Sequence, residues 1–531
     1  MDFHKLPWDE ADRILSVMTL EKKIGQMVIA SIEVTRMDAR TKTFLKEYAI
    51  GNVILFGKNC TGRSQIAALN REIQETVTEA TGLQALISID QEGGLVTRIR
   101  EGATVFPGAM SVSATGDAGN AYKTGYIMGS ELKALGIYHD LAPVMDCNFL
   151  EDPPVISSRS YASDPETTSA FAGAMARGLR EAGILDCGKH FPGQGHTPGD
   201  THFDFVVHAD PLEEIERHML PFCEAIRDGM CSIMTSHSCY PALDDRLIPN
   251  TLSDRVLQGL ARKQLGFEGL ILSDDVRMAA VEKKYGAPLA AVLAAQAGCD
   301  LVIIGSGGDN LDLDRMDIQG PIVRRMVEAA KSGELSMERI DDSVRRIIAV
   351  KLALGDMRSA AHPEKLNWTA HEAFAREMAL QSVRVERDRD HILPLSEGTL
   401  FLSRKESARL GLEEGDQLYD SFAALAAPLL RGECIEFEQI PDVEALRERI
   451  EEAPSVVLSV TWEGECLRLL ETMKEIMAIN PRFCFVCLNA PHIIRHVPFV
   501  PCVIFSYDQS IHSVQAVCAR MQEKVVVSSD L

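Results

Sequence analysis

Eight short apolar runs, separated by stretches with helical periodicity, constrain the fold of the first 355 residues more than any other feature. The runs are QMVIASI (26–32), GNVILF (51–56), ALISID (85–90), IYHDLAPV (137–144), ILDCGKHF (184–191), CSIMTSH (231–237), GLILSDD (269–275) and DLVIIG (300–305). Strands that alternate with helices and are apolar on both faces predict a parallel sheet. Eight such units predict a closed (β/α)8 barrel, with an open doubly wound sheet as the alternative that periodicity alone leaves open.

Five of these runs carry, at their ends or within the next two residues, polar residues that a buried strand does not need for packing. They are Asp90, Asp146, Lys189 with His190, His237, and Asp274 with Asp275. In a barrel of parallel strands, all carboxyl ends meet at the one face where substrates bind. The pattern therefore favours the barrel and predicts an active site at that face.

A second α/β pattern follows the barrel. Its candidate strands are TLFLS (399–403), CIEFEQ (434–439), SVVLSVT (455–461), FCFVCLN (483–489) and CVIFSYD (502–508). We predict an α/β protein with a TIM-like catalytic barrel over residues 1–356, and a linker with a connecting helix over 357–378. A smaller three-layer α/β sandwich is expected over 379–531.

Charge and cysteine usage narrow the class of protein. The chain of 531 residues has 54 Lys and Arg against 77 Asp and Glu, a net charge of -23, which disfavours nucleic acid as a partner. No apolar run reaches the ~18 residues that a membrane span needs, and the first residues do not resemble a signal peptide. The 13 cysteines are an odd number and are scattered along the chain, which indicates reduced thiols and a cytoplasmic protein.

The segment from Lys189 to Asp204, KHFPGQGHTPGDTHFD, holds the densest group of reactive side chains. Residues i and i+2 of an extended segment point the same way, so Asp200 and His202 can lie side by side. A carboxylate next to an imidazole fixes its tautomer and raises its basicity, as an acid/base catalyst requires. The same pair could hold a metal, but no HExxH-like spacing is present, and no metal or other cofactor is expected.

The seventh run ends in Ser273-Asp274-Asp275. A carboxylate at the mouth of a barrel can act as a nucleophile, a base or a ligand. We assign Asp274 to chemistry, and Asp275 to capping of the next helix or to hydrogen bonding. With His202 across the pocket, Asp274 completes a nucleophile and acid/base arrangement suited to group transfer at an acetal carbon.

Two further segments offer ligands for a substrate. Asp90 and Arg98 flank a Gly-Gly turn in DQEGGLVTR, and both side chains can bind vicinal hydroxyls. No phosphate-binding glycine motif surrounds this turn. Arg159, in ISSRSY, is a candidate substrate clamp, with a surface arginine in a loop as the alternative.

Together these motifs resemble glycoside hydrolase family 3, in the β-N-acetylglucosaminidase (NagZ-type) branch and its two-domain form. The similar segments include GNVILFGKN, DQEGG-x-V-x-R, LAPVMDCN, SSRSYASDP, KHFPG-x-G-x4-DTH, LGFEGLILSDDVRM and AGCDLVII. The sequence departs from the family pattern at Leu95, Gln194 and His196, which bears on the fine substrate preference.

The resemblance implies a retaining, two-step mechanism. Asp274 would be the nucleophile, His202 the acid/base, and Asp200 the residue that orients His202. An Asp–His pair would then replace the second carboxylate of most glycosidases. The positions expected to hold the sugar hydroxyls and the N-acetyl group are Asp90, Arg98, Arg159, Lys189 and His190.

The leading hypothesis is a hydrolase that releases terminal β-linked N-acetylglucosamine from muropeptide fragments or chito-oligosaccharides. A phosphorylase on the same scaffold, or a sugar-binding protein without turnover, are the alternatives. We expect a small carbohydrate as the partner, with a homodimer as an open arrangement. Arg98, Arg159 and Lys189 should form a local basic patch inside an acidic envelope.

Overall fold

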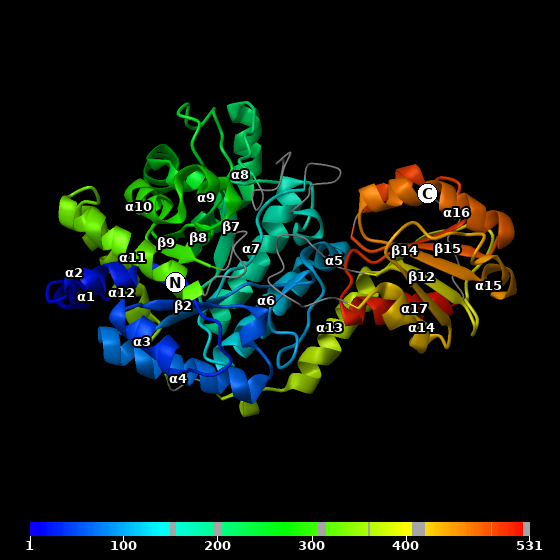
Figure 1. Ribbon diagram of the computed structural model, residues 1–531, viewed down its shortest axis with the longest axis horizontal. Coiled ribbons are helices and arrows are strands. Elements are labelled where there is room, and N and C mark those ends of the chain that lie inside the picture. The colour runs from blue at the N-terminus through cyan, green and yellow to red at the C-terminus, as the bar shows by residue number, and fades with distance from the viewer. Residues whose placement is uncertain are drawn as a thin grey trace.

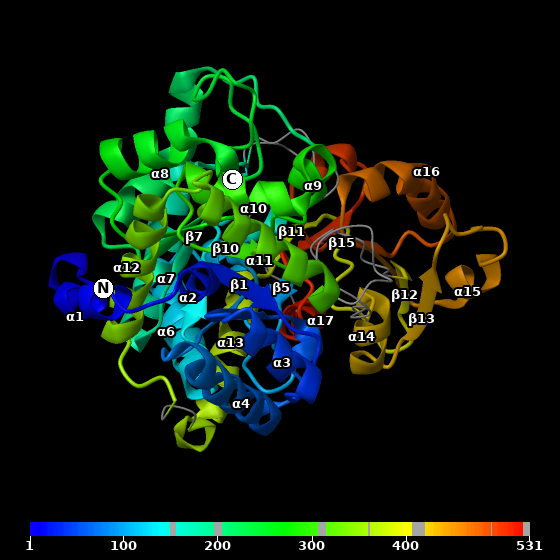
Figure 2. The ribbon, with the colours of Figure 1, turned by 60° about the vertical axis from the view of Figure 1, so that its left-hand side comes forward.

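The computed structural model describes residues 1–148, 156–195, 204–305, 315–358, 362–405, 420–489 and 491–523. Two α/β units lie side by side, and a helix of the chain runs between them (Figure 1 and, turned by 60°, Figure 2). Across these described ranges, no helix has the length and apolar character needed to cross a bilayer.

A ring of eight parallel strands forms the core of the first unit, counted over the described residues. They are β1 (Val28–Ser31), β2 (Asn52–Leu55), β3 (Leu86–Ile89), β6 (His139–Asp140), β7 (Cys187–Phe191), β8 (Ser232–Thr235), β9 (Leu270–Leu272) and β10 (Val302–Ile304). They pair in the orders β10-β1-β2-β3-β6 and β7-β8-β9. Parallel bridges between His139 and Leu185, and between Leu272 and Leu301, close both seams. All eight predicted strands are present, and the predicted barrel is confirmed.

Helices cover the outside of the ring (Figure 1). Their bounds are α1 (Trp8–Leu15), α2 (Leu20–Gln26), α3 (Ala39–Glu47), α4 (Arg63–Thr81), α5 (Ala109–Ala114), α6 (Ala118–Ala134), α7 (Pro165–Ala182), α8 (Leu212–Arg227), the π-helix η5 (Arg255–Gln264), α9 (Ala279–Tyr285), α10 (Ala287–Ala297), α11 (Arg315–Ser332) and α12 (Met337–Ala353). Local sequence sets their ends. In α7, the Asp164 carboxylate accepts a hydrogen bond from the Thr167 backbone and Pro165 opens the first turn, while Gly183 ends the helix at a φ of 89°.

The second unit is a six-stranded sheet between two layers of helices. Its strands are β11 (Arg384–Asp388), β12 (Leu400–Arg404), β13 (Glu433–Phe437), β14 (Val456–Val460), β15 (Phe483–Cys487) and β16 (Cys502–Phe505), in the order β11-β16-β15-β14-β12-β13. All pairs are parallel except β11 with β16. The five predicted strands are present, and the edge strand β11 is an addition.

Alternating side chains of this sheet enter two separate cores, which confirms the three-layer prediction. Val457 and Ile504 pack with α14 (Phe422–Leu429) and α17 (Ile511–Gln522) on one face. Leu458 and Phe485 pack with α15 (Arg447–Glu452) and α16 (Glu463–Ile479) on the other. Successive residues of a strand point to opposite faces, so one apolar run supplies both cores.

The helix α13 (Trp368–Ser382) joins the two units. Phe374 and Met378 belong to the core of the barrel, whereas Ala379 belongs to the core beneath α14 and α17. His371 Nδ1 lies 2.7 Å from a carboxylate oxygen of Glu131 on α6, which fastens the helix to the barrel.

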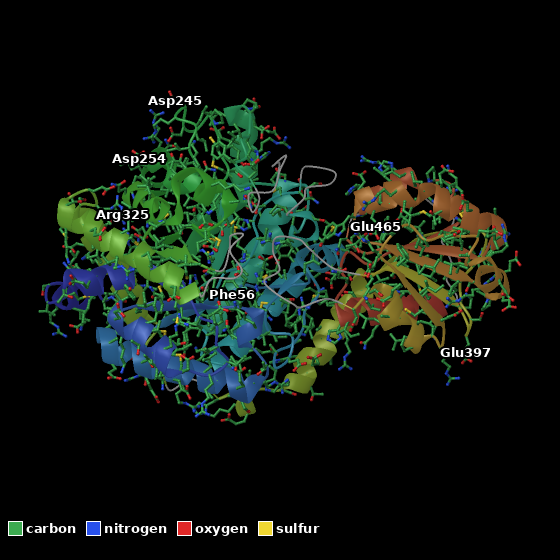
Figure 3. All side chains as sticks on the ribbon, viewed as in Figure 1. Phe56, Asp245, Asp254, Arg325, Glu397 and Glu465 are labelled. Atoms are coloured by element: carbon green, nitrogen blue, oxygen red, sulfur yellow. The ribbon has the colours of Figure 1, made fainter. Side chains whose placement is uncertain are left out.

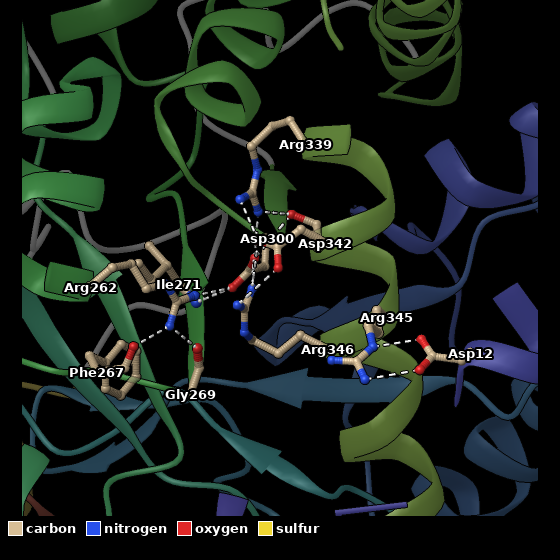
Figure 4. Close-up of polar contacts among 11 residues, drawn as sticks. Asp12, Arg262, Phe267, Gly269, Ile271, Asp300, Arg339, Asp342, Arg345 and Arg346 are labelled. Carbon is tan, nitrogen blue, oxygen red and sulfur yellow. Dashed lines mark hydrogen bonds and ion pairs between the residues drawn. The ribbon is translucent and has the colours of Figure 1, made fainter. Parts of the chain in front are cut away.

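At the amino-terminal end of the barrel, the buried carboxylate of Asp300 holds three arginines together (Figure 4). Its oxygens lie 2.6 Å from Arg262 Nη2, 2.9 Å from Arg339 Nη2 and 2.8 Å from Arg346 Nη1. Burial would raise the pKa of Asp300, but the three guanidinium groups hold that pKa below its usual value. The carboxylate thereby links η5 and α12 to the start of β10.

A buried lysine at the same end of the barrel has an unusual protonation equilibrium. Lys351 Nζ donates hydrogen bonds to Gln26 Oε1 at 2.7 Å and to the Gly51 carbonyl at 2.9 Å. Neither partner is an ion, and burial lowers the pKa of Lys351 to about 7. The native side chain therefore releases its proton above pH 7, whereas the unfolded side chain keeps its proton up to about pH 10.

We expect Lys351 to make stability rise with pH between about 7 and 10, because the unfolded state then binds one more proton than the native state. The slope is at most about 1.4 kcal/mol per pH unit. Urea unfolding of the wild type and of Lys351→Met at several pH values measures this contribution. The free energy of unfolding of the wild type minus that of the variant should increase with pH, and a constant difference would contradict the prediction.

Candidate active site

The predicted polar strand ends meet at the carboxyl-terminal mouth of the barrel. Lys189 is the centre of a buried ion cluster there: its Nζ lies 2.5 Å from Asp90 Oδ1 and 2.7 Å from Glu92 Oε1. Arg159 forms a two-pronged pair with the same Glu92, at 2.9 and 2.8 Å. Burial would raise the pKa of Glu92, but Arg159 and Lys189 hold that pKa far below its usual value.

The predicted basic patch is wrong. Arg159 and Lys189 are each within 2.9 Å of a carboxylate, so Asp90 and Glu92 neutralise them. The cluster of Asp90, Glu92, Arg159 and Lys189 has two negative and two positive groups, so its formal charges balance. Such a set can both donate hydrogen bonds to neutral hydroxyl and amide groups and accept hydrogen bonds from them.

Glu92 is the member of this cluster that sequence reasoning missed. It lies on β4 (Gln91–Gly93), which forms a short antiparallel hairpin with β5 (Val96–Thr97). Residues two apart in an extended segment share a face. The spacing from Asp90 could therefore have identified Glu92.

The strand β7 changes register between Lys189 and Phe191, which gives its last residues two different partners. His190 Nδ1 lies 2.7 Å from Asp146 Oδ2, and the backbone N–H groups of His190 and Gln194 also donate to Asp146. A bulge of this kind re-aims a side chain at the rim of a barrel. Asp146 as the acceptor places the proton on Nδ1 and fixes the tautomer of His190.

Arg98 follows the hairpin directly. Its backbone N–H donates to Gln91 Oε1 at 3.0 Å, and its guanidinium lies 5.6 Å from the centre of the Phe56 ring. Phe56 comes directly after β2 and lies near the middle of the barrel in Figure 3. The structure thus brings Arg98 to the same mouth as the ion cluster.

Asp274 follows β9 and is half-buried. Its Oδ1 accepts a hydrogen bond of 2.7 Å from the backbone N–H of Asp275. The Asp275 carboxylate in turn accepts from the backbone of Gly305, at 2.9 Å, and of Arg277. The cap of α9 is Met278, so Asp275 takes the hydrogen-bonding role, not the capping role, and ties the ends of β9 and β10 together.

Two of the three predicted catalytic residues, Asp200 and His202, lie outside the described residues, as does His196. Their side by side arrangement and their roles stay predictions. The structure pairs Asp90 with Lys189 directly and joins Arg159 to Lys189 through Glu92. It places Arg98 directly after β5, His190 near the end of β7 and Asp274 after β9.

The second domain packs against the turn that carries Glu92. Gly94 has a φ of 58°, and a Cβ at this position would lie 2.6 Å from Gly108 Cα and 2.9 Å from Asp508 Oδ1. Asp508 is buried in the connection after β16, where its Oδ2 accepts from the Ser510 backbone. Only glycine fits this close approach.

Comparison with known proteins agrees with this architecture. Residues 19–350 match the model of the glycosyl hydrolase family 3 N terminal domain. A β-hexosaminidase of Methylococcus capsulatus is 38% identical over 275 residues, 51% of this chain and 79% of the relative. A β-hexosaminidase of Hydrogenovibrio crunogenus is 33% identical over 297 residues, 54% of this chain and 81% of the relative.

A solved structure extends the likeness to both domains. It is a glycoside hydrolase family 3 β-N-acetylglucosaminidase from Paenibacillus sp. str. FPU-7, with a TM-score of 0.85 and 28% identity over 96% of this chain and 98% of that one. Fold and sequence together define an enzyme that cleaves glycosidic bonds. The chain belongs to glycoside hydrolase family 3, as its motifs predicted.

Proposed function

We propose that this glycoside hydrolase releases terminal β-linked N-acetylglucosamine with retention of configuration, through a covalent glycosyl-enzyme intermediate. The observation that carries the proposal is the buried cluster of Asp90, Glu92, Arg159 and Lys189 at the barrel mouth that Asp274 also borders. The β-hexosaminidase and β-N-acetylglucosaminidase relatives support the choice of sugar.

In the first step, the Asp274 carboxylate attacks the anomeric carbon and forms a glycosyl ester. His202 donates its proton to the glycosidic oxygen, so that the leaving group departs as a neutral alcohol. In the second step, neutral His202 takes a proton from water, the oxygen of that water attacks the anomeric carbon, and the Asp274 carboxylate is released. Two inversions at one carbon give net retention. Asp200 orients His202 and stabilises its charged form.

The sugar would be held by the cluster together with Arg98 and His190. Asp90 and Glu92 can accept hydrogen bonds from hydroxyls, whereas Lys189, Arg159 and Arg98 can donate to hydroxyls or to the N-acetyl carbonyl. A site of buried polar groups rejects a sugar that lacks the matching hydroxyl or amide, because its own groups are then left without a partner.

For the natural substrate, we propose muropeptide fragments recycled in the cytoplasm, with chito-oligosaccharides as the other class. All thirteen cysteines are free thiols in the structure, which supports a reducing compartment. A homodimer is one proposed oligomeric state, and light scattering in solution tests it.

The proposal is tested with an aryl N-acetyl-β-glucosaminide, followed by NMR of the first product, with and without inorganic phosphate. We expect free N-acetylglucosamine that is β-configured before it mutarotates, in both conditions. An α-configured first product would contradict retention. A sugar 1-phosphate that forms only with phosphate would identify a phosphorylase, and binding without cleavage would identify a sugar-binding protein.

Glu92→Gln should lower kcat/KM for the aryl glycoside by about 100-fold or more. Breaking a buried ion pair leaves charge uncompensated, at a cost of about 3–5 kcal/mol. A loss of ~2.7 kcal/mol of this from transition-state binding corresponds to a roughly 100-fold decrease in kcat/KM. Lys189 and Arg159 would then share a neutral amide and shift within the site. Steady-state kinetics measure the loss.

The matched control is Glu334→Gln. Glu334 also pairs with an arginine: Nη2 of Arg325 donates to both of its carboxylate oxygens, at 2.7 and 2.8 Å. This pair is on the more exposed surface of α11 and the turn after it (Arg325 is labelled in Figure 3). We expect wild-type kinetics for this variant. Equal kinetics of the two variants would show that Glu92 does not contribute to the site.

A further inference from the structure

A cavity of about 510 Å³ lies between the two domains, where the carboxyl ends of both parallel sheets contribute to its lining. His492 follows β15 and Tyr507 follows β16, while Asn148 and Ser163 lie between β6 and α7 of the barrel. Ligands of parallel α/β sheets bind at the carboxyl ends of the strands. This position therefore has the geometry of a ligand site from both domains.

The cavity adjoins the proposed sugar site along the chain. Tyr161 in its wall comes two residues after Arg159, and Asn148 comes two residues after Asp146, the partner of His190. Two residues span at most about 7 Å. The Asn148 backbone donates to the Ala162 carbonyl at 3.0 Å, which holds the two wall segments together. A substrate longer than one sugar could extend from the one site into the other.

The lining combines apolar with polar side chains and carries no carboxylate among its described residues, although the chain as a whole has a net charge of -23. Its cation is Arg384, at the start of β11, whose Nη2 donates to the Ala114 carbonyl at 3.0 Å. A guanidinium has five donors in a planar fork, so this one bond leaves it the capacity to bind a carboxylate. Glu463, 3.9 Å from His492, is already paired with Arg495 at 2.6 Å.

The backbone conformation of Tyr507 is held in place by its surroundings. Tyr507 has a φ of 58°, a left-handed conformation that is rare for a residue other than glycine. Such a conformation costs energy and persists where the surrounding structure enforces it. Here the next residue is Asp508, which is packed against Gly94. The aromatic ring of Tyr507 thus lines the cavity from a connection that the barrel holds in place.

We propose that this cavity binds the aglycone, the part of the substrate that leaves, and that Arg384 selects an aglycone bearing a carboxylate. The inference rests on the proposed function and assigns the second domain a role in specificity. The hydroxyl, amide and aromatic groups of the lining contact the sugar ring of any aglycone, whereas the Arg384 fork adds affinity only for a charged one. Cleavage of a substrate too short to reach the cavity does not depend on Arg384.

The test compares three substrates: an aryl N-acetyl-β-glucosaminide, N,N′-diacetylchitobiose, and N-acetylglucosaminyl-β-1,4-N-acetylmuramic acid, whose lactyl group supplies a carboxylate. Arg384→Gln keeps a donor for the Ala114 carbonyl and removes the charge. We expect kcat/KM for the acidic disaccharide to fall about 10- to 100-fold, mainly through KM, as for a lost charge-assisted hydrogen bond. For the other two substrates, kcat/KM should change by less than about twofold, which is too small a change for a lost hydrogen bond.

Arg384→Lys should recover part of the loss, because it keeps the charge without the fork. The control is Arg431→Gln, an exposed arginine of the same domain that pairs with Glu397 at 2.9 Å (Glu397 is labelled at the far side in Figure 3). Equal losses on all three substrates, or no loss on the acidic one, would overturn the inference. Failure of the wild type to cleave the aryl glycoside would instead overturn the proposed function.

Discussion

Asp274→Ala should lower kcat by at least about 10⁴-fold on every substrate, the loss that follows removal of a covalent nucleophile. The variant cannot form the glycosyl ester, and the half-buried position after β9 leaves no second carboxylate in the same place, since Asp275 is bound to the Gly305 and Arg277 backbone. Single-turnover and steady-state assays with the aryl glycoside measure the effect.

Asp275→Asn is the matched control for Asp274→Ala. An amide oxygen can still accept from the Gly305 backbone, so β9 and β10 stay tied and we expect activity within about tenfold of the wild type, the scale of one weakened hydrogen bond. Both variants should show the unfolding curve of the wild type. An active Asp274→Ala variant, or the larger loss in Asp275→Asn, would reverse the assignment of the two carboxylates.

Asp300→Asn should lower the free energy of unfolding by about 3–5 kcal/mol, the cost of removing one partner from a buried ion pair. Three arginines converge on this carboxylate within 2.6–2.9 Å, and an amide would leave their charges facing one another (Figure 4). Urea unfolding at neutral pH measures the loss. The barrel mouth lies at the other end of the strands, so the kinetics of the folded variant should change little.

Asp12→Asn provides the comparison, because its partner is an arginine of the same helix, α12. Asp12 forms a two-pronged pair with Arg345, the neighbour of Arg346, at 2.6 and 2.9 Å, but this pair is exposed to solvent (Figure 4). Exposed pairs contribute little to stability. The variant should unfold close to the wild type, and similar losses in both variants would show that burial is not what makes Asp300 important.

The strands could be predicted from the sequence because burial of a strand requires an apolar run. A parallel strand buried on both faces must be apolar throughout, and all eight barrel runs and five runs of the second domain form strands. The edge strand β11 was missed for the same reason. Its residues RVERD are mostly charged, as an unpaired edge facing water requires.

The partners of the site residues could not be predicted, because each pair joins residues far apart in the chain. Arg159 and Glu92 are 67 positions apart, and His190 and Asp146 are 44. Counting Arg98, Arg159 and Lys189 as a basic patch failed because residue type gives the sign of a charge and not its neighbour. Asp200 and His202 lie outside the described residues, so their part of the prediction stays untested.

The helix α13 serves two cores at once, and this has a consequence for how the protein comes apart. Phe374 packs edge to face with Phe106 of the barrel, with ring centres 6.3 Å apart, while Ala379, little more than one turn later, is buried in the second domain. Cutting the chain before or after α13 would therefore expose one of the two cores to water. The two domains share this helix, so the barrel and the sandwich should unfold in a single transition.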